Sequence, residues 1–240
     1  LRSFDLSMPE EINRMVTDCL SDYFFVTEES GIKNLLNEGK PIERIHFVGN
    51  VMIDDLFHQL KRLQSHNGVR FPSEEIKKKY PQYIFLTLHR PSNVDSRKCF
   101  MEIADTLNLI AEDYPIFFPV HPRTSKMMQE FAIKLSPRVK QLPPLGFKES
   151  LFLWKDAVLV MTDSGGLQEE TTALGVPCIT LRENTERPIT IEMGTNILAG
   201  TSKDSILKAY TKALQRGRGK AKVPPKWDGR AAERIWEVLL

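Results

Sequence analysis

Polar side chains follow four apolar segments of this sequence, at the points where each segment would end as a β-strand. These polar runs are His89-Arg90, His121-Pro122-Arg123, Asp163-Ser164-Gly165-Gly166 and Arg182 with Glu186-Arg187 shortly after it. In open α/β sheets, ligands bind outside the carboxyl ends of parallel strands. We therefore expect these side chains to meet at one edge of a sheet and to bind a polar ligand there.

The segment from Asp163 to Glu170 has the most informative spacing. Two glycines, Gly165 and Gly166, follow an apolar run and open a predicted helix, so a ligand could approach the backbone closely. The free N–H groups and dipole of such a helix terminus favour an anion such as a pyrophosphate. Glu170 lies one turn further and could accept hydrogen bonds from ribose hydroxyls. The alternative is an N-cap with a glycine turn and surface glutamates, and this motif alone leaves both interpretations open.

Three further side chains have both a functional and a local interpretation. His89 and His121 each end a predicted strand, where a histidine could act as an acid, a base or a phosphate donor. Each could instead cap its own loop. Arg187 could bind phosphate or sugar, or form an ion pair with Glu183 or Glu186.

Glu10 presents the same choice on a predicted helix. Ser7 and Glu10 have the spacing of a capping box, in which Ser7 caps the helix and Glu10 reaches back to it. Glu10 could also pair with Arg14 one turn further along. From the residues alone, both local roles compete with a catalytic role for this carboxylate.

Short apolar runs alternate with helical patterns from residue 83 onwards, which predicts βαβ units and a doubly wound parallel sheet. The predicted strands span residues 83–88, 116–120, 139–142, 158–162, 178–181 and 196–199. The predicted helices include 99–112, 126–135, 166–174 and, at the end, 230–240. Before this region we predict helices at 9–21, 28–38 and from Met52, strands at 23–27 and 45–48, and a solvated connection at 64–80.

Composition excludes several classes of protein. The net charge of +2 is too small for a nucleic-acid-binding surface. No apolar stretch approaches the roughly 20 residues of a membrane span. The three cysteines are scattered without metal-ligand spacing, so we expect free thiols, no metal and a cytoplasmic protein. The chain opens without methionine, and we expect a truncated product whose residues 1–48 are the remnant of a preceding lobe.

The chain resembles the non-hydrolysing UDP-N-acetylglucosamine 2-epimerases in nine segments, which occur in the same order along the sequence. The segments are Leu1-Arg2, Pro9–Arg14, Gly49–Asp54, His89-Arg90, Pro119–Pro122, Thr162–Glu170, Gly175–Pro177, Thr185–Pro188 and Asp228–Ile235. The resemblance implies a glycosyltransferase-B-like α/β fold with two Rossmann-type lobes. It further implies that residues 49–226 form the UDP-binding lobe and that residues 227–240 return to the first lobe. A homodimer without a metal or other cofactor is also expected.

The resemblance also implies a reaction and its residues. UDP-N-acetylglucosamine and UDP-N-acetylmannosamine are interconverted by loss of UDP to 2-acetamidoglucal and re-addition with C2 inverted. Glu10 and His89 match catalytic positions. Positions expected to bind UDP are Ser164, Gly165, Gly166, Glu170, Arg187 and His121. Pro91, Ser92 and Ser150 depart from the family pattern, and further active-site groups of the family lie before Leu1.

Other activities stay open at this stage. A hydrolysing epimerase would release free N-acetylmannosamine, and a two-lobed glycosyltransferase would transfer the sugar. The chain could also be a UDP-binding unit that is inert alone. Because part of the family's catalytic set is missing, we expect weak UDP binding and little turnover from these 240 residues.

Overall fold

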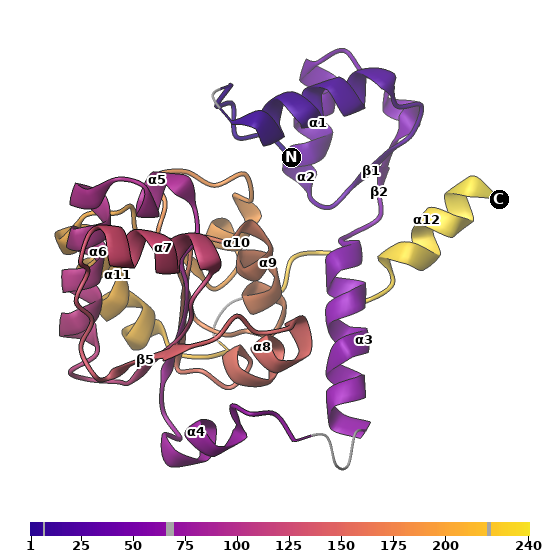
Figure 1. Ribbon diagram of the computed structural model, residues 1–240. Coiled ribbons are helices and arrows are strands. Elements are labelled where there is room, and N and C mark those ends of the chain that lie inside the picture. The colour runs from indigo at the N-terminus through magenta and orange to yellow at the C-terminus, as the bar shows by residue number, and fades with distance from the viewer. Residues whose placement is uncertain (7, 66–69, 220–221) are drawn as a thin grey trace.

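The computed structural model describes residues 1–6, 8–65, 70–219 and 222–240 (Figure 1). The strands are β1 Phe24–Val26, β2 Ile45–Phe47, β3 Ile84–Thr87, β4 Ile116–Pro119, β5 Val139–Leu142, β6 Leu159–Thr162, β7 Cys178–Thr180 and β8 Asn196–Leu198. The α-helices are α1 Pro9–Leu20, α2 Glu29–Asn37, α3 Val51–Ser65, α4 Glu74–Lys79, α5 Pro91–Val94, α6 Arg97–Ile110, α7 Pro122–Glu130, α8 Phe147–Trp154, α9 Gly165–Ala173, α10 Ile189–Glu192, α11 Lys203–Arg216 and α12 Ala231–Leu239. A 3₁₀ helix spans Ile42–Arg44.

The main sheet has six strands in the order β5-β4-β3-β6-β7-β8, and every pairing is parallel. The chain first builds outward from β3 to β5, and then crosses back to place β6 on the other side of β3. This is the strand order of a Rossmann-type doubly wound sheet, with its topological switch point between β3 and β6. The predicted fold class is confirmed.

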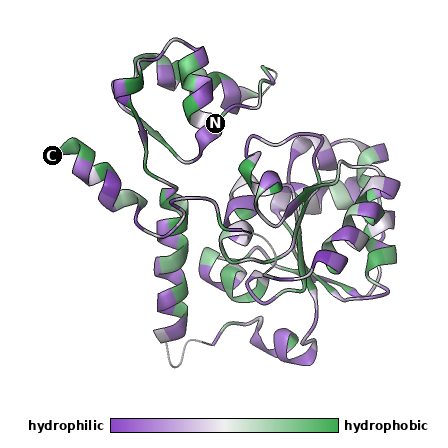
Figure 2. Cartoon of the chain, turned by 180° about the vertical axis from the view of Figure 1, so that it is seen from behind, coloured by the Kyte–Doolittle hydropathy of each residue, from purple (hydrophilic) through white to green (hydrophobic). Residues whose placement is uncertain are grey.

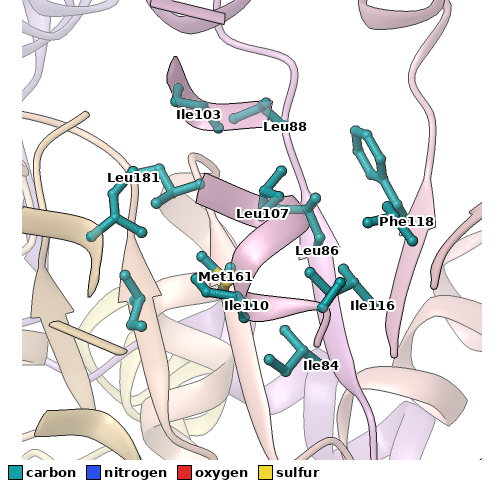
Figure 3. Packing of buried hydrophobic residues seen from close by; sticks show 14 of the residues in the cluster. Ile84, Leu86, Leu88, Ile103, Leu107, Ile110, Ile116, Phe118, Met161 and Leu181 are labelled. Carbon is teal, nitrogen blue, oxygen red and sulfur yellow. The ribbon is translucent and has the colours of Figure 1, made fainter. Parts of the chain in front are cut away.

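Two cores cover the two faces of this sheet, because successive side chains of a strand point to opposite faces. On one face, Ile84 and Leu86 of β3 pack with Leu107 and Ile110 of α6 (Figure 3) and with α11. On the other face, Phe85 packs with α3, α8 and α9. Both cores consist of side chains with almost no exposure, so the strand ends are held in fixed positions.

The parallel pair β1-β2, flanked by α1 and α2, forms a smaller unit apart from the main sheet (Figure 1). Among the described residues, the buried apolar cluster of this unit comprises Phe24, Val26, Leu35 and Ile45. Several apolar side chains of α1, including Val16 and Leu20, are exposed, and Figure 2 shows hydrophobic segments both in this unit and near the end of α12. Among the described residues, no helix is long and apolar enough to cross a membrane.

The polypeptide connects the two parts at two places. The first is the segment before α3, where Gly49 has a φ of +95° and a Cβ added to it would lie 2.0 Å from the Lys226 carbonyl oxygen. The second is the segment before α12, where Trp227 Nε1 donates to the Thr27 carbonyl at 3.0 Å; within α12, Arg234 donates to the Val48 carbonyl at 3.0 Å. The C-terminal segment therefore contacts residues 1–48 directly.

Two element predictions were wrong in detail. The segment at 64–80 was predicted as a solvated connection, but it contains α4, whose Lys77 packs its ammonium group over the Phe152 ring. Residues 66–69 of that prediction lie outside the described residues. The helix predicted at 126–135 is α7, which begins at Pro122 because proline suits the first turn of a helix. It ends at Glu130, and Ala132 has a positive φ of 53°.

Candidate functional site

Asp163 organises the switch point of the main sheet. Its side chain lies directly after β6 and is fully buried. One carboxylate oxygen accepts hydrogen bonds from the backbone N–H groups of His89 at 2.8 Å and Arg90 at 2.7 Å, and from Asn93 Nδ2 at 3.2 Å. The other oxygen lies 3.0 Å from His89 Nδ1. One buried carboxylate therefore fixes the turn after β3 and the orientation of its histidine.

His89 lies beside this carboxylate and is partly exposed. The hydrogen bond to Asp163 raises the pKa of His89 above its usual 6.5, because it favours the imidazolium form more than burial opposes it. The predicted alternative, a histidine that caps its own loop, is wrong for His89, because its partner Asp163 lies in a different loop, directly after β6.

His121 lies opposite, with its ring centroid 5.7 Å from that of His89. Its Nδ1 accepts a hydrogen bond from the Arg123 backbone N–H at 3.2 Å, so His121 is the N-cap residue of α7. The predicted local role of His121 is thus confirmed, while its ring also borders the cavity described below.

The turn after β6 leads into α9 without a side-chain cap. Ser164 is the N-cap residue, but its side chain makes no capping hydrogen bond to the helix. Its backbone N–H donates to Thr162 Oγ1 at 2.9 Å. Glu169 and Glu170 on α9 are only 3% and 7% exposed. The alternative of surface glutamates is therefore wrong, and these buried carboxylates require an explanation.

Arg187 lies against the beginning of α9. A Cβ added to Gly165 would lie 2.4 Å from Arg187 Nη1, so only glycine leaves room for the guanidinium at this position. Arg187 pairs with Glu186 at 2.6 Å and with Glu169 at 2.9 Å. The predicted ion pair with Glu186 is therefore confirmed. The alternative partner Glu183 instead accepts hydrogen bonds from Thr201.

The carboxylate of Glu186 lies close to three arginine side chains. It lies 2.6 Å from Arg187, 3.0 Å from Arg182 and 3.6 Å from Arg14 of α1. Burial opposes its ionisation, but the positive charges of Arg187 and Arg182 outweigh burial and lower the pKa of Glu186 to about 2. A charged network thus joins α1 to the main lobe beside α9.

A cavity of about 400 Å³ opens at the carboxyl ends of β3, β4 and β6. Five residues predicted for the site border it: His89, His121, Ser164, Gly166 and Glu170. Its remaining border is largely apolar, with contributions from Met52, Pro144, Leu145, Phe147 and Trp154. Burial, together with the neighbouring Glu169 and Asp55 charges, raises the pKa of Glu170 to about 7.

Glu10 borders a different cavity, of about 610 Å³, between α1 and the turn after β3. Its carboxylate lies 3.5 Å from Arg90 Nη1 and its side chain is 54% exposed. The predicted pair between Glu10 and Arg14 is wrong, because Arg14 pairs with Glu11 and Glu186. The predicted capping box depends on Ser7, which lies outside the described residues; the N-cap residue of α1 is Met8.

The sequence assigned no individual role to three acids that the structure places beside the site, namely Asp163, Glu169 and Glu186. Asp163 and Glu186 occur in the polar runs after strands, which was the available signal, whereas Glu169 lies within α9. In the part of the chain that the structure describes, no group of three histidine, cysteine, aspartate or glutamate side chains is arranged to hold a metal ion.

A Rossmann-type sheet with a nucleotide-sized cavity at its switch point, joined to a second α/β unit, defines a protein of the glycosyltransferase-B-like class. The comparisons with known proteins agree. The family model for UDP-N-acetylglucosamine 2-epimerase matches residues 1–240. The chain belongs to this family.

Two archaeal relatives illustrate the similarity. The UDP-N-acetylglucosamine 2-epimerase of Methanocaldococcus jannaschii is 43% identical over 247 residues, which cover 100% of this chain and 66% of the relative. That of Methanococcus maripaludis is 43% identical over 225 residues, covering 91% of this chain and 61% of the relative. The chain thus spans less than two thirds of the length of these relatives.

Solved structures are equally similar. The M. jannaschii epimerase in complex with UDP-GlcNAc and UDP superposes with a TM-score of 0.88 at 41% identity, and the alignment covers 100% of this chain and 66% of the other. The epimerase of Neisseria meningitidis bound to UDP-GlcNAc superposes with a TM-score of 0.85 at 27% identity. The alignment covers 100% of this chain and 67% of the other.

Proposed function

We propose that this chain carries the UDP-binding lobe of an enzyme that interconverts UDP-N-acetylglucosamine and UDP-N-acetylmannosamine without hydrolysis. The observation that carries this proposal is the cavity at the switch point, where His89, His121, Ser164, Gly166 and Glu170 converge. The family match supplies the substrate class, since relatives of this name have been solved with UDP-GlcNAc.

In this proposal the diphosphate lies at the N-terminus of α9. The first N–H groups of that helix have no capping side chain from Ser164, and Arg187 supplies a positive charge beside Gly165. Both features favour a dianionic leaving group. Glu170 accepts hydrogen bonds from the ribose hydroxyls, and the apolar border of the cavity receives the uracil ring.

The chemistry begins with cleavage of the bond between sugar C1 and the diphosphate oxygen. The electron pair leaves with UDP, and the helix terminus stabilises the developing negative charge. A base removes the C2 proton to give 2-acetamidoglucal, and the reverse steps add UDP and the proton with C2 inverted. We assign Glu10 to this proton transfer and His89, whose imidazolium form the hydrogen bond to Asp163 favours, to the diphosphate.

Product analysis tests this proposal. The protein is incubated with UDP-N-acetylglucosamine, and the products are followed by NMR of the C2 position. UDP-N-acetylmannosamine is the expected product, with little turnover from these 240 residues and more from a version extended upstream of Leu1. Free N-acetylmannosamine with UDP would identify a hydrolysing enzyme, and a transferred sugar would identify a glycosyltransferase. UDP binding without any turnover would identify a nucleotide-binding unit that is inert alone.

A nucleotide comparison tests the role of Glu170. Replacing Glu170 with alanine removes one charged hydrogen-bonding partner, which typically costs about 1.5–3 kcal/mol of binding free energy. Calorimetry should show a loss of UDP affinity, together with a reduced preference for UDP over its 2′-deoxy analogue. An equal loss for both nucleotides would reject the ribose contact.

We also propose the division at residues 48/49 and 226/227, a homodimer, a cytoplasmic location and a role in polysaccharide biosynthesis. The separate sheets β1-β2 and β3–β8 support the first boundary, and the contacts of Trp227 and Arg234 with residues 27 and 48 support the second. Light scattering of the purified protein tests the dimer, since a monomer mass would reject it.

A further inference from the structure

To bind a ligand well, the Arg187 side chain must be held in one conformation. Its guanidinium lies against Gly165 at the start of α9, with the side chain only 15% exposed. A long arginine side chain loses rotamer freedom when it is fixed in one geometry, and that loss weakens any ligand contact formed at the same time. Contacts that fix Arg187 before a ligand arrives would remove this penalty.

Glu169 supplies such a contact from the interior of α9. Its side chain is 4% exposed, and one carboxylate oxygen lies 2.9 Å from Arg187 Nε. The other oxygen accepts a hydrogen bond from Asn50 Nδ2 at 3.0 Å. Asn50 lies at the start of α3, directly after the connection at Gly49. Glu169 therefore links Arg187 to the segment that connects the two parts of the molecule.

Glu186 also pairs with Arg187, but it divides its charge among several partners. Arg182 and Arg14 lie within 4.0 Å of the same carboxylate. Among the ion pairs of the described residues, Arg187 is the single cationic partner of Glu169. Within the described residues, the Glu186 carboxylate is therefore shared among three arginines, whereas the Glu169 carboxylate restrains Arg187 alone.

We propose that Glu169 is a positioning residue that holds Arg187 over the N-terminus of α9 for the diphosphate of the nucleotide. This inference rests on the proposed function, since it assigns a diphosphate to that terminus. Glu169 itself does not touch the nucleotide. It acts through Arg187, and through Asn50 it makes the position of Arg187 depend on the connection before α3.

The first experiment examines the restraint without any nucleotide. NMR of arginine Nε–H groups in the 240-residue protein should show a slowly exchanging Arg187 signal. Glu169→Gln should speed the exchange of that signal at least about 10-fold, since the charged acceptor is lost. Glu38→Gln is the matched control, because Glu38 pairs with another buried arginine, Arg2, away from α9. An Arg187 signal unchanged by Glu169→Gln would overturn the proposal.

The second experiment compares UDP with uridine by NMR titration. Glu169→Gln should lower UDP affinity about 10-fold and leave uridine affinity within about twofold, because uridine has no diphosphate. In an Arg187→Gln background, adding Glu169→Gln should have no further effect on UDP. Equal losses for both ligands, or additive effects of the two substitutions, would show a merely structural role and overturn the proposal.

A second variant covers the case in which Glu169→Gln does not fold. Glu169→Asp keeps the charge but shortens the side chain, so it should fold and still speed the Arg187 exchange and weaken UDP selectively. If the parent protein binds no UDP, the proposed function fails. The exchange measurement then still decides whether Glu169 holds Arg187.

Discussion

Helices α1 and α9 both carry an acid that we assign to the same reaction, but they are held in very different ways. Eight of the nine residues of α9 are buried, including Glu169 and Glu170. Of the 12 residues of α1, Glu11 alone is buried, and the nearby Glu10 has one ion pair, at 3.5 Å. The side of the site to which we assign the nucleotide is thus fixed by the main sheet, whereas Glu10 depends on a few contacts across the molecule. Substitutions in the two helices should therefore change different properties of the protein.

The largest expected effect separates chemistry from binding. Glu10→Gln removes a charge with little change in shape, so in a version of the protein extended upstream of Leu1, exchange of the C2 hydrogen with deuterated solvent should fall about 10²–10⁴-fold. UDP affinity and melting temperature should not change, because the Glu10 side chain is half exposed. Glu29→Gln on α2 is the control. A loss of stability with normal exchange per folded molecule would show that Glu10 is a structural residue.

Asp163→Asn should have the next largest effect, on stability. The replacement breaks a buried charged contact with His89 and introduces N–H groups among donors, at a cost of about 3–5 kcal/mol in the free energy of unfolding. Asp113→Asn, which affects one hydrogen bond from Tyr210, should cost far less. Urea denaturation measures both.

The same variant should also change the pH dependence of folding. Since the folded pKa of His89 lies above 6.5, its contribution to stability is complete below pH 6.5 and is lost as the pH rises through the folded value. In Asp163→Asn this decline should disappear. A decline that persists unchanged would mean that Asp163 does not set the charge of His89.

Gly165→Val should weaken UDP binding at least about 100-fold, or roughly 2.7 kcal/mol. The new Cβ would occupy the space of the Arg187 guanidinium and force it away from the start of α9. Gly146→Val is the matched control, because a Cβ at that N-cap position meets nothing within 4 Å. Normal calorimetric affinity in Gly165→Val would contradict the diphosphate position.

The smallest expected effect is on the free energy of unfolding, and it is seen by comparing an exposed valine with a buried one. Val16→Thr on α1 replaces a side chain that is 54% exposed, so the free energy of unfolding should change by less than about 0.5 kcal/mol. Val160→Thr in β6 places a hydroxyl at a position with no exposure and should cost about 1–3 kcal/mol. Equal losses would show that the exposed face of α1 is covered in solution.

The strands could be predicted closely because a parallel sheet buries both faces of each strand. Ile84–Thr87 and Leu159–Thr162 are therefore continuous apolar runs, which polar residues end abruptly. The helices α4 and α8 were harder to find. The first is six residues long and mostly charged, and neither has a side-chain cap, so their positions depend on packing against the lobe.

The site could be predicted only in part, for a similar reason. The turn from Asp163 to Gly166 has a local signature, and its place at the switch point follows from topology. The contacts of Glu169 with Asn50 and of Asp163 with His89 join residues 119 and 74 positions apart. No local pattern specifies such pairs, so the charged network around Arg187 required the structure.

The chain passes between its two parts twice, at Gly49 and again before α12, and the two passages lie in contact. Two neighbouring attachment points define an axis. Rotation about that axis would separate Arg14 from Glu186 and Glu10 from Arg90, whereas sliding of one part against the other would also stretch both connections. The space between Glu10 and Arg90 should therefore open and close by rotation of one part of the molecule about this single axis.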